Sequence, residues 1–166
     1  MTRLEYANKY GSVAVEASKG TTLFPSLFIA QAILESSDRN GNVANSTLAK
    51  KYNNHFGVKA DKSWKGKVVS LQTGEVYNGQ NVVITDGFRV YDTPLDSFKD
   101  RVKFLQQNQR YAKAGVFTAK TPFAQAQALQ KAGYATAPNY AEVLSSIIKT
   151  GNLTELDKKK LLLESA

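Results

Sequence analysis

The sequence predicts an α+β fold that is mostly helical, with a helical body and one small antiparallel β lobe. Helix start signals and apolar residues at helical spacing occur in both the first and the last third of the chain. Between them, residues 59–91 are rich in Val, Ile, Thr and aromatic side chains, which favour strands. We find no internal repeat and no Pro/Ser-rich linker, so residues 1–166 are expected to form a single domain, which the candidate residues below suggest is catalytic.

Two helices are predicted in the N-terminal part. The first begins with a Thr-x-x-Glu capping box, with Thr2 as the cap and Glu5 reaching back to it, and it ends at Gly20. The second begins at Pro25, because proline is tolerated in a first helical turn, and is apolar nearly all round through Leu34. A helix that is apolar on every face is typical of a core, so we expect this one to be buried.

The β lobe is predicted after a polar loop and a short helix near TLAKKY, residues 47–52. GKVVSLQ and NVVITDGFRVY are expected to pair in an antiparallel sheet of two or three strands. TGEVYNG contains two glycines and an Asn-Gly pair, so it is predicted to be the loop that joins them. This interpretation places Glu75 in a loop and Asp86 in the turn TDGF.

Helices are predicted again after the lobe. Thr93 and Thr121 each precede a proline, so each is expected to cap a helix, and Pro138 is expected to begin another. Phe98, Val102 and Leu105 supply a buried stripe to the first of these helices. A last, partly frayed helix is predicted in the C-terminal segment at about 152–166. Its lysine run, DKKK, is interpreted as a solvated helix end rather than a docking patch.

The composition narrows the classes of function. The chain carries 22 Lys plus Arg against 14 Asp plus Glu, a net charge of +8, which favours a polyanionic partner such as nucleic acid, an anionic membrane or a bacterial wall. It has no cysteine, which excludes disulfides and thiolate metal sites. Signal-peptide patterns, an apolar run of membrane-spanning length, P-loops and zinc-finger spacing are all absent from the sequence. We therefore expect no membrane span and no nucleic-acid partner.

Glu35 is the first candidate for chemistry. If the second helix continues to it, Phe28, Gln31, Ala32 and Glu35 share one face. Burial and the negative end of the helix dipole both disfavour the ionised carboxyl, so the pKa of Glu35 should be raised. A raised pKa suits a general acid that works near neutral pH. From position alone, the alternative of a structural glutamate turned into solvent is at least as well supported.

Glycoside hydrolysis uses a second anionic group beside the acid. Glu75 is the candidate, because a carboxylate in the β lobe could be held above a cleft, and Asp86 is a weaker one. On composition alone an exposed acid at a hairpin tip is the better explanation of Glu75, because such tips are commonly charged. His55 is the only histidine and has no carboxylate near it in sequence, so we interpret it as a loop side chain rather than a ligand or a base.

Four blocks in order resemble a known family. AQAILES, STLAKKYNNHFGVK, FRVYDTPLDSFKD and AGYATAPNYAEVLSSIIK are similar to glycoside hydrolase family 73, the glucosaminidases that include the flagellar peptidoglycan hydrolase domain and several autolysins. The resemblance runs from about Thr2 to Thr150. It implies a lysozyme-like fold, in which a substrate groove lies between a helical body and a small β lobe.

The resemblance also implies site residues. Glu35 matches the family's general acid, with Gln31 one turn earlier, and Glu75 is similar in placement to the family's second acid. The substrate-binding residues that it implies are Gln31, Asn53, Asn54, Phe56, Tyr134 and Tyr140, of which Tyr140 is more often a packing residue in relatives. No metal and no organic cofactor are implied.

The function implied is that of an endo-β-N-acetylglucosaminidase that cleaves the β-1,4 bond between N-acetylglucosamine and N-acetylmuramic acid in peptidoglycan glycan strands. We expect a monomer that acts at the bacterial cell wall, periplasmic or extracellular, where the positive charge would aid binding. The export route stays open among a phage system, a secretion-system effector and a trimmed domain. A muramidase or lytic transglycosylase on the same fold, or a wall-binding module without catalysis, are the alternatives.

Overall fold

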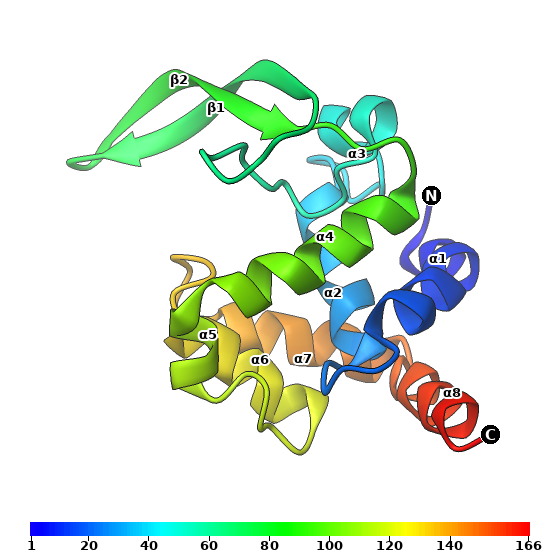
Figure 1. Cartoon of the computed structure of the whole chain (residues 1–166). Helices are drawn as coiled ribbons and strands as arrows, with labels where there is room; N and C mark the ends of the chain where they lie inside the picture. Colours follow the sequence, from blue (N-terminus) through cyan, green and yellow to red (C-terminus); the bar gives the residue numbers. More distant parts are fainter.

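The computed structural model describes residues 1–166, apart from the side chain of Glu75. In this described part, a body of helices carries one long β hairpin that projects from it as an arm (Figure 1). The predicted α+β fold, mostly helical with a small β lobe, is confirmed. The elements in chain order are α1 Arg3–Ser18, α2 Pro25–Ser36, α3 Thr47–Tyr52, β1 Val68–Tyr77, β2 Gln80–Arg89, α4 Pro94–Gln107, α5 Gln109–Ala114, α6 Pro122–Lys131, α7 Tyr140–Thr150 and α8 Thr154–Glu164.

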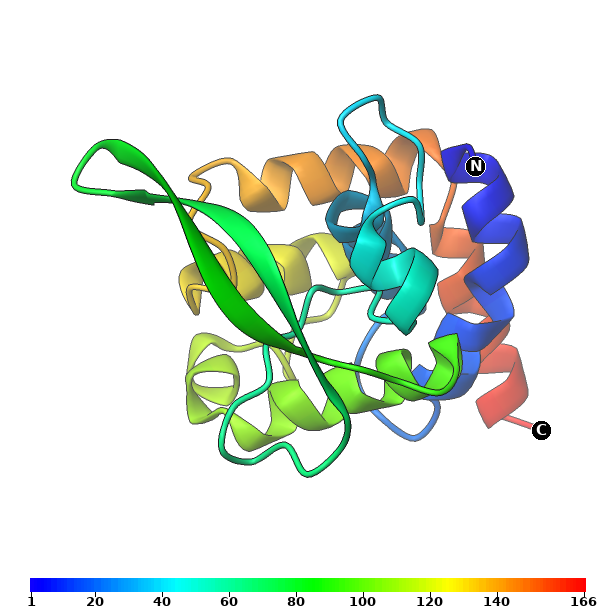
Figure 2. The same cartoon turned by 90° about the horizontal axis from the view of Figure 1, so that it is seen from above.

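Helix α2 lies at the centre of the helical body, as its apolar sequence predicts. It packs against α1, α6, α7 and α8, and these helices surround it when the molecule is viewed from above (Figure 2). Leu27, Phe28, Ile29 and Ile33 of this helix are at most 2% exposed. Burying side chains of this size contributes roughly 1.5–3 kcal/mol each to folding. The residues at the last turn of α2 are therefore held by a helix that is buried along most of its length.

Threonine caps fix the starts of three helices. The Thr2 hydroxyl accepts a hydrogen bond from the Glu5 amide at 3.1 Å, and Thr121 does the same for Ala124 at 3.1 Å. Thr93 accepts from the Asp96 amide at 3.2 Å, and the proline that follows it is the first residue of α4. These predicted caps are confirmed.

The arm is a two-stranded antiparallel ribbon whose register runs from Val68 opposite Arg89 to Tyr77 opposite Gln80. Its turn consists of Asn78 and Gly79 alone, which both have positive φ, 51° and 76°. Such a two-residue turn matches the twist of the strands, so pairing continues up to it. Residues 59–60 flank β2 on its other side through a bridge between Lys59 and Phe88.

This register corrects two predictions. Glu75 does not lie in a loop: its main chain is in β1, opposite Val82. Asp86 does not lie in a turn: it is in β2, opposite Leu71. The sequence TGEVYNG was interpreted as a loop because it contains two glycines, but only the Asn-Gly pair needs the left-handed conformation that glycine supplies. Gly74 is accommodated in the strand.

The C-terminal half also differs from the prediction in places. Helix α5 was not predicted, and α7 begins at Tyr140 rather than at Pro138. Helix α8 is not frayed, because Asp157 accepts hydrogen bonds from the amide and the hydroxyl of Ser26, at 2.9 and 2.7 Å. Lys160, in the run predicted to be solvated, is buried and donates to the Thr21 carbonyl at 2.6 Å. Among the described residues, no helix is long and apolar enough to cross a membrane.

Candidate active site

A cleft of about 530 Å³ opens at the end of α2. Glu35 contributes a carboxyl group to this cleft. The loop of residues 56–61, which leads to the arm, forms one wall. The other walls come from α4 and α5 and from the loop after α6. The remaining lining residues are Phe104, Arg110, Tyr111, Tyr134, Ala135 and Thr136. These segments lie far apart along the chain, and the packing of the helical body brings them together.

Glu35 lies in the last turn of α2, as predicted. Its side chain lines the cleft and is exposed to solvent there. The pKa of Glu35 is raised, chiefly because burial disfavours the charged carboxylate. A hydrogen bond from the Tyr140 hydroxyl and the positive charge of Arg101 act in the opposite direction. A carboxyl held in this way remains protonated to higher pH than a free glutamate.

Gln31 and Tyr140 form a buried pair behind the acid. The Gln31 side-chain amide donates to the Tyr140 hydroxyl oxygen at 2.7 Å, and both side chains are at most 3% exposed. Because that oxygen accepts from Gln31, the hydroxyl proton of Tyr140 is free to point to Glu35. Tyr140 in turn stacks on Tyr134, with ring centroids 5.9 Å apart, and Tyr134 lines the cleft.

Arg101 is an unexpected cation in the core. It comes from α4, is 1% exposed, and its guanidinium lies 5.2 Å from the centroid of the Phe56 ring and 6.0 Å from that of Tyr134. Its Nε and Nη1 have no hydrogen-bond partner among the described residues. Burial lowers the pKa of Arg101, while the Tyr134 and Tyr140 hydroxyls raise it. The cation thus sits directly behind two rings of the cleft region.

The Asn-Asn-x-Phe-Gly block folds as a tight turn. Asn53 adopts φ 56°, and its amide donates to the carbonyls of Tyr91 and Asp92 at 3.1 Å. Asn54 is 1% exposed. Its side-chain Nδ2 donates to the carbonyls of Val58 and Arg89 at 3.0 and 2.9 Å, and its Oδ1 accepts from the main-chain N–H of Val58 at 3.0 Å. Of this block, Phe56 and Gly57 line the cleft. The two asparagine side chains bind the main chain that builds the wall.

His55 lies in the turn that follows α3, and its side chain is buried. Its Nδ1 and the Tyr6 hydroxyl are 2.6 Å apart, and the imidazole is 2% exposed. Burial, and to a lesser degree the charge of Lys9, lowers the pKa of His55 to about 4. A neutral imidazole in the core serves the packing of the fold.

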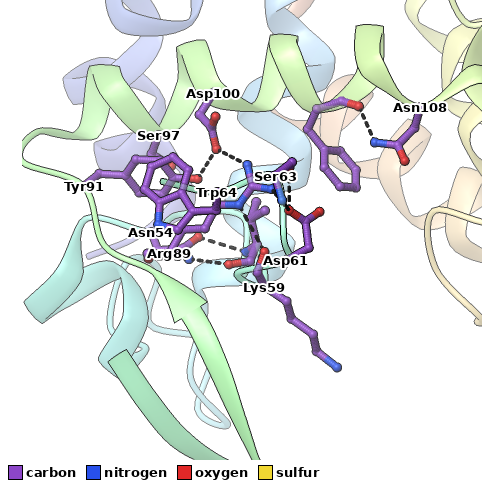
Figure 3. A network of polar contacts seen from close by, with 12 residues as sticks. Asn54, Lys59, Asp61, Ser63, Trp64, Arg89, Tyr91, Ser97, Asp100 and Asn108 are labelled. Carbon is purple, nitrogen blue, oxygen red and sulfur yellow. Dashed lines mark hydrogen bonds and ion pairs between the residues drawn. The ribbon is translucent and has the colours of Figure 1, made fainter. Parts of the chain in front are cut away.

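A polar network fixes the base of the arm to the helical body (Figure 3). Arg89, at the end of β2, forms ion pairs with Asp100 of α4 at 2.8 Å and with Asp61 at 3.2 Å. Trp64 stacks on the same guanidinium, 5.0 Å from its ring centroid, and Tyr91 also bonds Asp100. Because Asp61 also lines the cleft, this network links the arm, the wall and α4.

The second predicted acid is only partly placed. The main chain of Glu75 lies in β1, but its side chain is outside the described residues. Asp86, the weaker candidate, forms an ion pair with Lys59 at 2.9 Å and does not line the cleft. Asp61 is a cleft carboxylate that sequence reasoning missed. Its pKa is lowered, chiefly by hydrogen bonds from Ser63 and to a lesser degree by the charge of Arg89, although burial opposes this shift. Within the described residues no group of His, Cys, Asp and Glu could hold a metal ion.

Known proteins match the chain over most of its length. The family described as Glucosaminidase, mannosyl-glycoprotein endo-beta-N-acetylglucosaminidase, matches residues 11–153. The chain belongs to this glucosaminidase family. The resemblance found in the sequence, and the lysozyme-like fold that it implied, are confirmed.

Individual members of the glucosaminidase family show the extent of the similarity. Peptidoglycan hydrolase FlgJ from Salmonella typhimurium is 45% identical over 123 residues, which are 74% of this chain and 38% of FlgJ. Exo-glucosaminidase LytG from Bacillus subtilis is 38% identical over 146 residues, 86% of this chain and 49% of LytG. The chain therefore spans less than half the length of these two relatives.

Solved structures of the family share the fold. The catalytic domain of the autolysin Auto from Listeria monocytogenes superposes with a TM-score of 0.78 at 32% identity, over 93% of this chain and 86% of that one. The glycoside hydrolase domain of Salmonella typhimurium FlgJ superposes with a TM-score of 0.68 at 34% identity, over 99% and 98% of the two chains.

Proposed function

We propose that the chain is a peptidoglycan hydrolase, an endo-β-N-acetylglucosaminidase that cleaves the β-1,4 bond after N-acetylglucosamine. The observation that carries this proposal is Glu35, a carboxyl of raised pKa at the end of a buried helix, open to a cleft on one side. The names of the relatives, peptidoglycan hydrolase and exo-glucosaminidase, support the substrate and the bond. Residues 1–166 act as one catalytic domain and need no cofactor.

Glu35 acts as the general acid. Its proton passes to the glycosidic oxygen, the bond from the sugar C1 to that oxygen breaks, and the bonding electrons leave with the oxygen. The carboxylate that remains is stabilised by the Tyr140 hydroxyl and by the charge of Arg101, which both favour the ionised form. Water then adds to C1 on the sugar, and its proton restores the acid.

The positive charge that develops on the sugar calls for an anion on the opposite side of the cleft. Glu75 takes this role in our proposal, delivered by the arm. Asp61 offers a second described carboxylate in the cleft, but its ion pair with Arg89 commits it to the wall.

The other predicted site residues divide into two groups. Phe56 and Tyr134 line the cleft, so we assign them to contact with the sugar rings. Gln31, Asn53, Asn54 and Tyr140 bond to main chain or to one another, so we assign them to positioning rather than to substrate contact. The protein acts as a monomer at the cell wall, to which its net charge of +8 attracts it.

The test is to digest purified peptidoglycan, reduce the products with borohydride and identify the reduced sugar by mass spectrometry. We expect N-acetylglucosaminitol ends from the wild type and none from Glu35→Gln. Glu16→Gln, an exposed substitution on α1 with the same change in charge, is the matched control and should retain activity. Long soluble fragments early in the digest indicate internal cleavage, whereas single disaccharides would indicate an exo-acting enzyme.

Other products would contradict the proposal in distinct ways. Reduced muramic acid ends would indicate a muramidase, and anhydro-muramic ends a lytic transglycosylase. Binding to sacculi without new ends, from a folded preparation, would indicate a wall-binding module. All three outcomes leave the fold unchanged: the first two replace the bond assignment, and the third replaces the catalytic function.

A further inference from the structure

Arg110 is a cleft cation that the proposed mechanism does not use. It is the second residue of α5, its side chain is exposed, and it lines the same cleft as Glu35. Among the described residues no carboxylate lies within ion-pair distance of it. The other basic groups nearby differ in this respect, because Lys59 pairs with Asp86 and Arg89 with Asp61 and Asp100.

The guanidinium of Arg110 is held in place although it is exposed. Its Nη2 donates to the Tyr111 hydroxyl at 2.9 Å, and its Cζ lies 4.9 Å from the centroid of the same ring. Tyr111 is fully buried, so it provides a fixed support. Gly133 lies on another side: a Cβ built there would come within 3.9 Å of Nη1. The planar group is therefore oriented before any ligand arrives.

Four of the five N–H groups of the guanidinium remain available, because Nη2 uses one donor on Tyr111 and Nε and Nη1 make no hydrogen bond within the described residues. Arginine presents such donors as a fork that matches a carboxylate in geometry and charge. The sugar rings of a glycan strand are uncharged, but a muramic acid unit carries either a peptide, which ends in carboxylates, or, where no peptide is attached, a free lactyl carboxylate. A cation beside the acid would thus detect the substituents of the strand rather than its sugars.

We propose that Arg110 is a specificity-determining residue that binds a carboxylate of the lactyl or peptide substituent on the glycan. It selects carboxylated strands over neutral polymers of N-acetylglucosamine. This inference rests on the proposed function, since it names the group of the same substrate that the cleft recognises. Arg101 does not share this role, because it is buried behind the rings of Phe56 and Tyr134.

The experiment compares two forms of one substrate. Peptidoglycan is either left native or has its carboxylates converted to neutral amides with methylamine and a carbodiimide. The KM for release of reducing ends is measured on both forms for the wild type, Arg110→Gln, Arg110→Lys and Lys113→Gln. Lys113 is exposed on the same helix and does not line the cleft. Lys113→Gln removes one positive charge, as Arg110→Gln does, so it is the matched control.

On native substrate, Arg110→Gln should raise KM about fivefold, the effect of one solvent-accessible charge pair, with little change in kcat. Arg110→Lys should recover part of the loss, and Lys113→Gln should behave like the wild type. On the amidated substrate, Arg110→Gln and the wild type should have equal KM values. A third digest uses strands from which an amidase has removed the peptides, which frees the lactyl carboxylates. The effect of Arg110→Gln on KM should increase there if Arg110 binds the lactyl carboxylate, and it should disappear if Arg110 binds the peptide carboxylates.

Equal KM values for Arg110→Gln and Lys113→Gln on native substrate would overturn the inference, as would a loss that persists unchanged after amidation. If the wild type releases no reducing ends from either form, the proposed function fails, and affinity for the two forms is measured by co-sedimentation instead. The inference then survives only if Arg110→Gln weakens binding to the native form alone. Thermal unfolding of each variant verifies that the fold is retained.

Discussion

The guanidinium of Arg101 lies 4.3 Å from the centroid of the Phe28 ring, in the interface between α4 and α2. Phe28 and Glu35 lie two turns apart on the same face of α2, so the cation is held on the face that carries the acid. Aromatic faces attract a cation but do not neutralise it. Its field therefore reaches the carboxyl, and the protonation of Glu35 depends on it.

Replacing Arg101 by Met should raise the pKa of Glu35 further, because the substitution removes a charge that favours the carboxylate. The acid then stays protonated to higher pH, so the alkaline limb of the pH profile of kcat/KM should move upward. Arg101→Lys, which keeps the charge, should leave the limb close to its wild-type position. An unmoved limb in a folded Met variant would show that the cation does not act on the acid.

Removing the Tyr140 hydroxyl should affect both the acid and the fold. Tyr140→Phe deletes a group that lowers the pKa of Glu35 and leaves the buried Gln31 amide without its partner. We expect the alkaline limb to move upward and the free energy of unfolding to fall by about 1–3 kcal/mol. Urea denaturation and pH–rate profiles measure the two effects. Tyr10→Phe, on α1 and outside the cleft lining, is the control and should change neither.

Glu75→Gln tests the arm. If Glu75 supplies the anion that balances the charge on the sugar, kcat should fall by about a hundredfold or more while KM changes little. Asp61→Asn, in the wall, should weaken the Arg89 network and lower stability instead. Retention of near wild-type kcat by Glu75→Gln would transfer the anionic role to the N-acetyl group of the substrate or to a transglycosylase mechanism.

The buried imidazole predicts a loss of stability in acid. The pKa of His55 is about 4 in the folded protein, below its ordinary value of 6.5, so the unfolded chain takes up a proton that the folded one excludes. The stability that neutral His55 contributes is present above pH 6.5 and is lost as pH falls toward 4. The full effect corresponds to about 3 kcal/mol. Unfolding free energies measured from pH 7 to 4 should fall less steeply for His55→Gln than for the wild type.

Asn54→Ala should be destabilising because three main-chain groups lose their buried partner. We expect a cost of about 2–4 kcal/mol, with Asn81→Ala, an exposed change on the arm, as a control within about 0.5 kcal/mol of wild type. Chemical denaturation provides the comparison. A stable Asn54→Ala protein with impaired sugar binding would instead support the substrate contact inferred from the sequence.

The parts of the site that depend on local order along the chain were predictable. The register of α2 places Gln31 and Glu35 on one face, and a helix fixes such spacing without help from the rest of the fold. The hydrogen bond from Gln31 to Tyr140 was not predictable, because it joins residues 109 positions apart and depends on how α7 packs on α2. The same holds for the cleft wall, which α5 enters although its six residues gave no helix signal.

Arg101 left a signal that could have been used. The buried stripe predicted for α4 contains Phe98, Val102 and Leu105, and position 101 lies three residues after the first and four before the last. A charged residue at that spacing belongs to the buried face. The stripe was predicted from its apolar residues alone, so the arginine at the same helical spacing was not considered as a buried residue. The prediction that Glu75 lies in a loop was wrong for a different reason. Both glycines of TGEVYNG were interpreted as turn residues, but only Gly79 adopts a positive φ.

The attachment of Glu35 to the central helix has a consequence for how the protein loses activity. Amide hydrogens of α2 should exchange with solvent only through global unfolding, whereas those of the two-stranded arm, which no second sheet covers, should exchange through local opening. Mild heat or denaturant would therefore release the arm while the acid keeps its place. Inactivation under such conditions would be reversible on cooling or dilution, because α2 and Glu35 stay folded and only the arm has to form again.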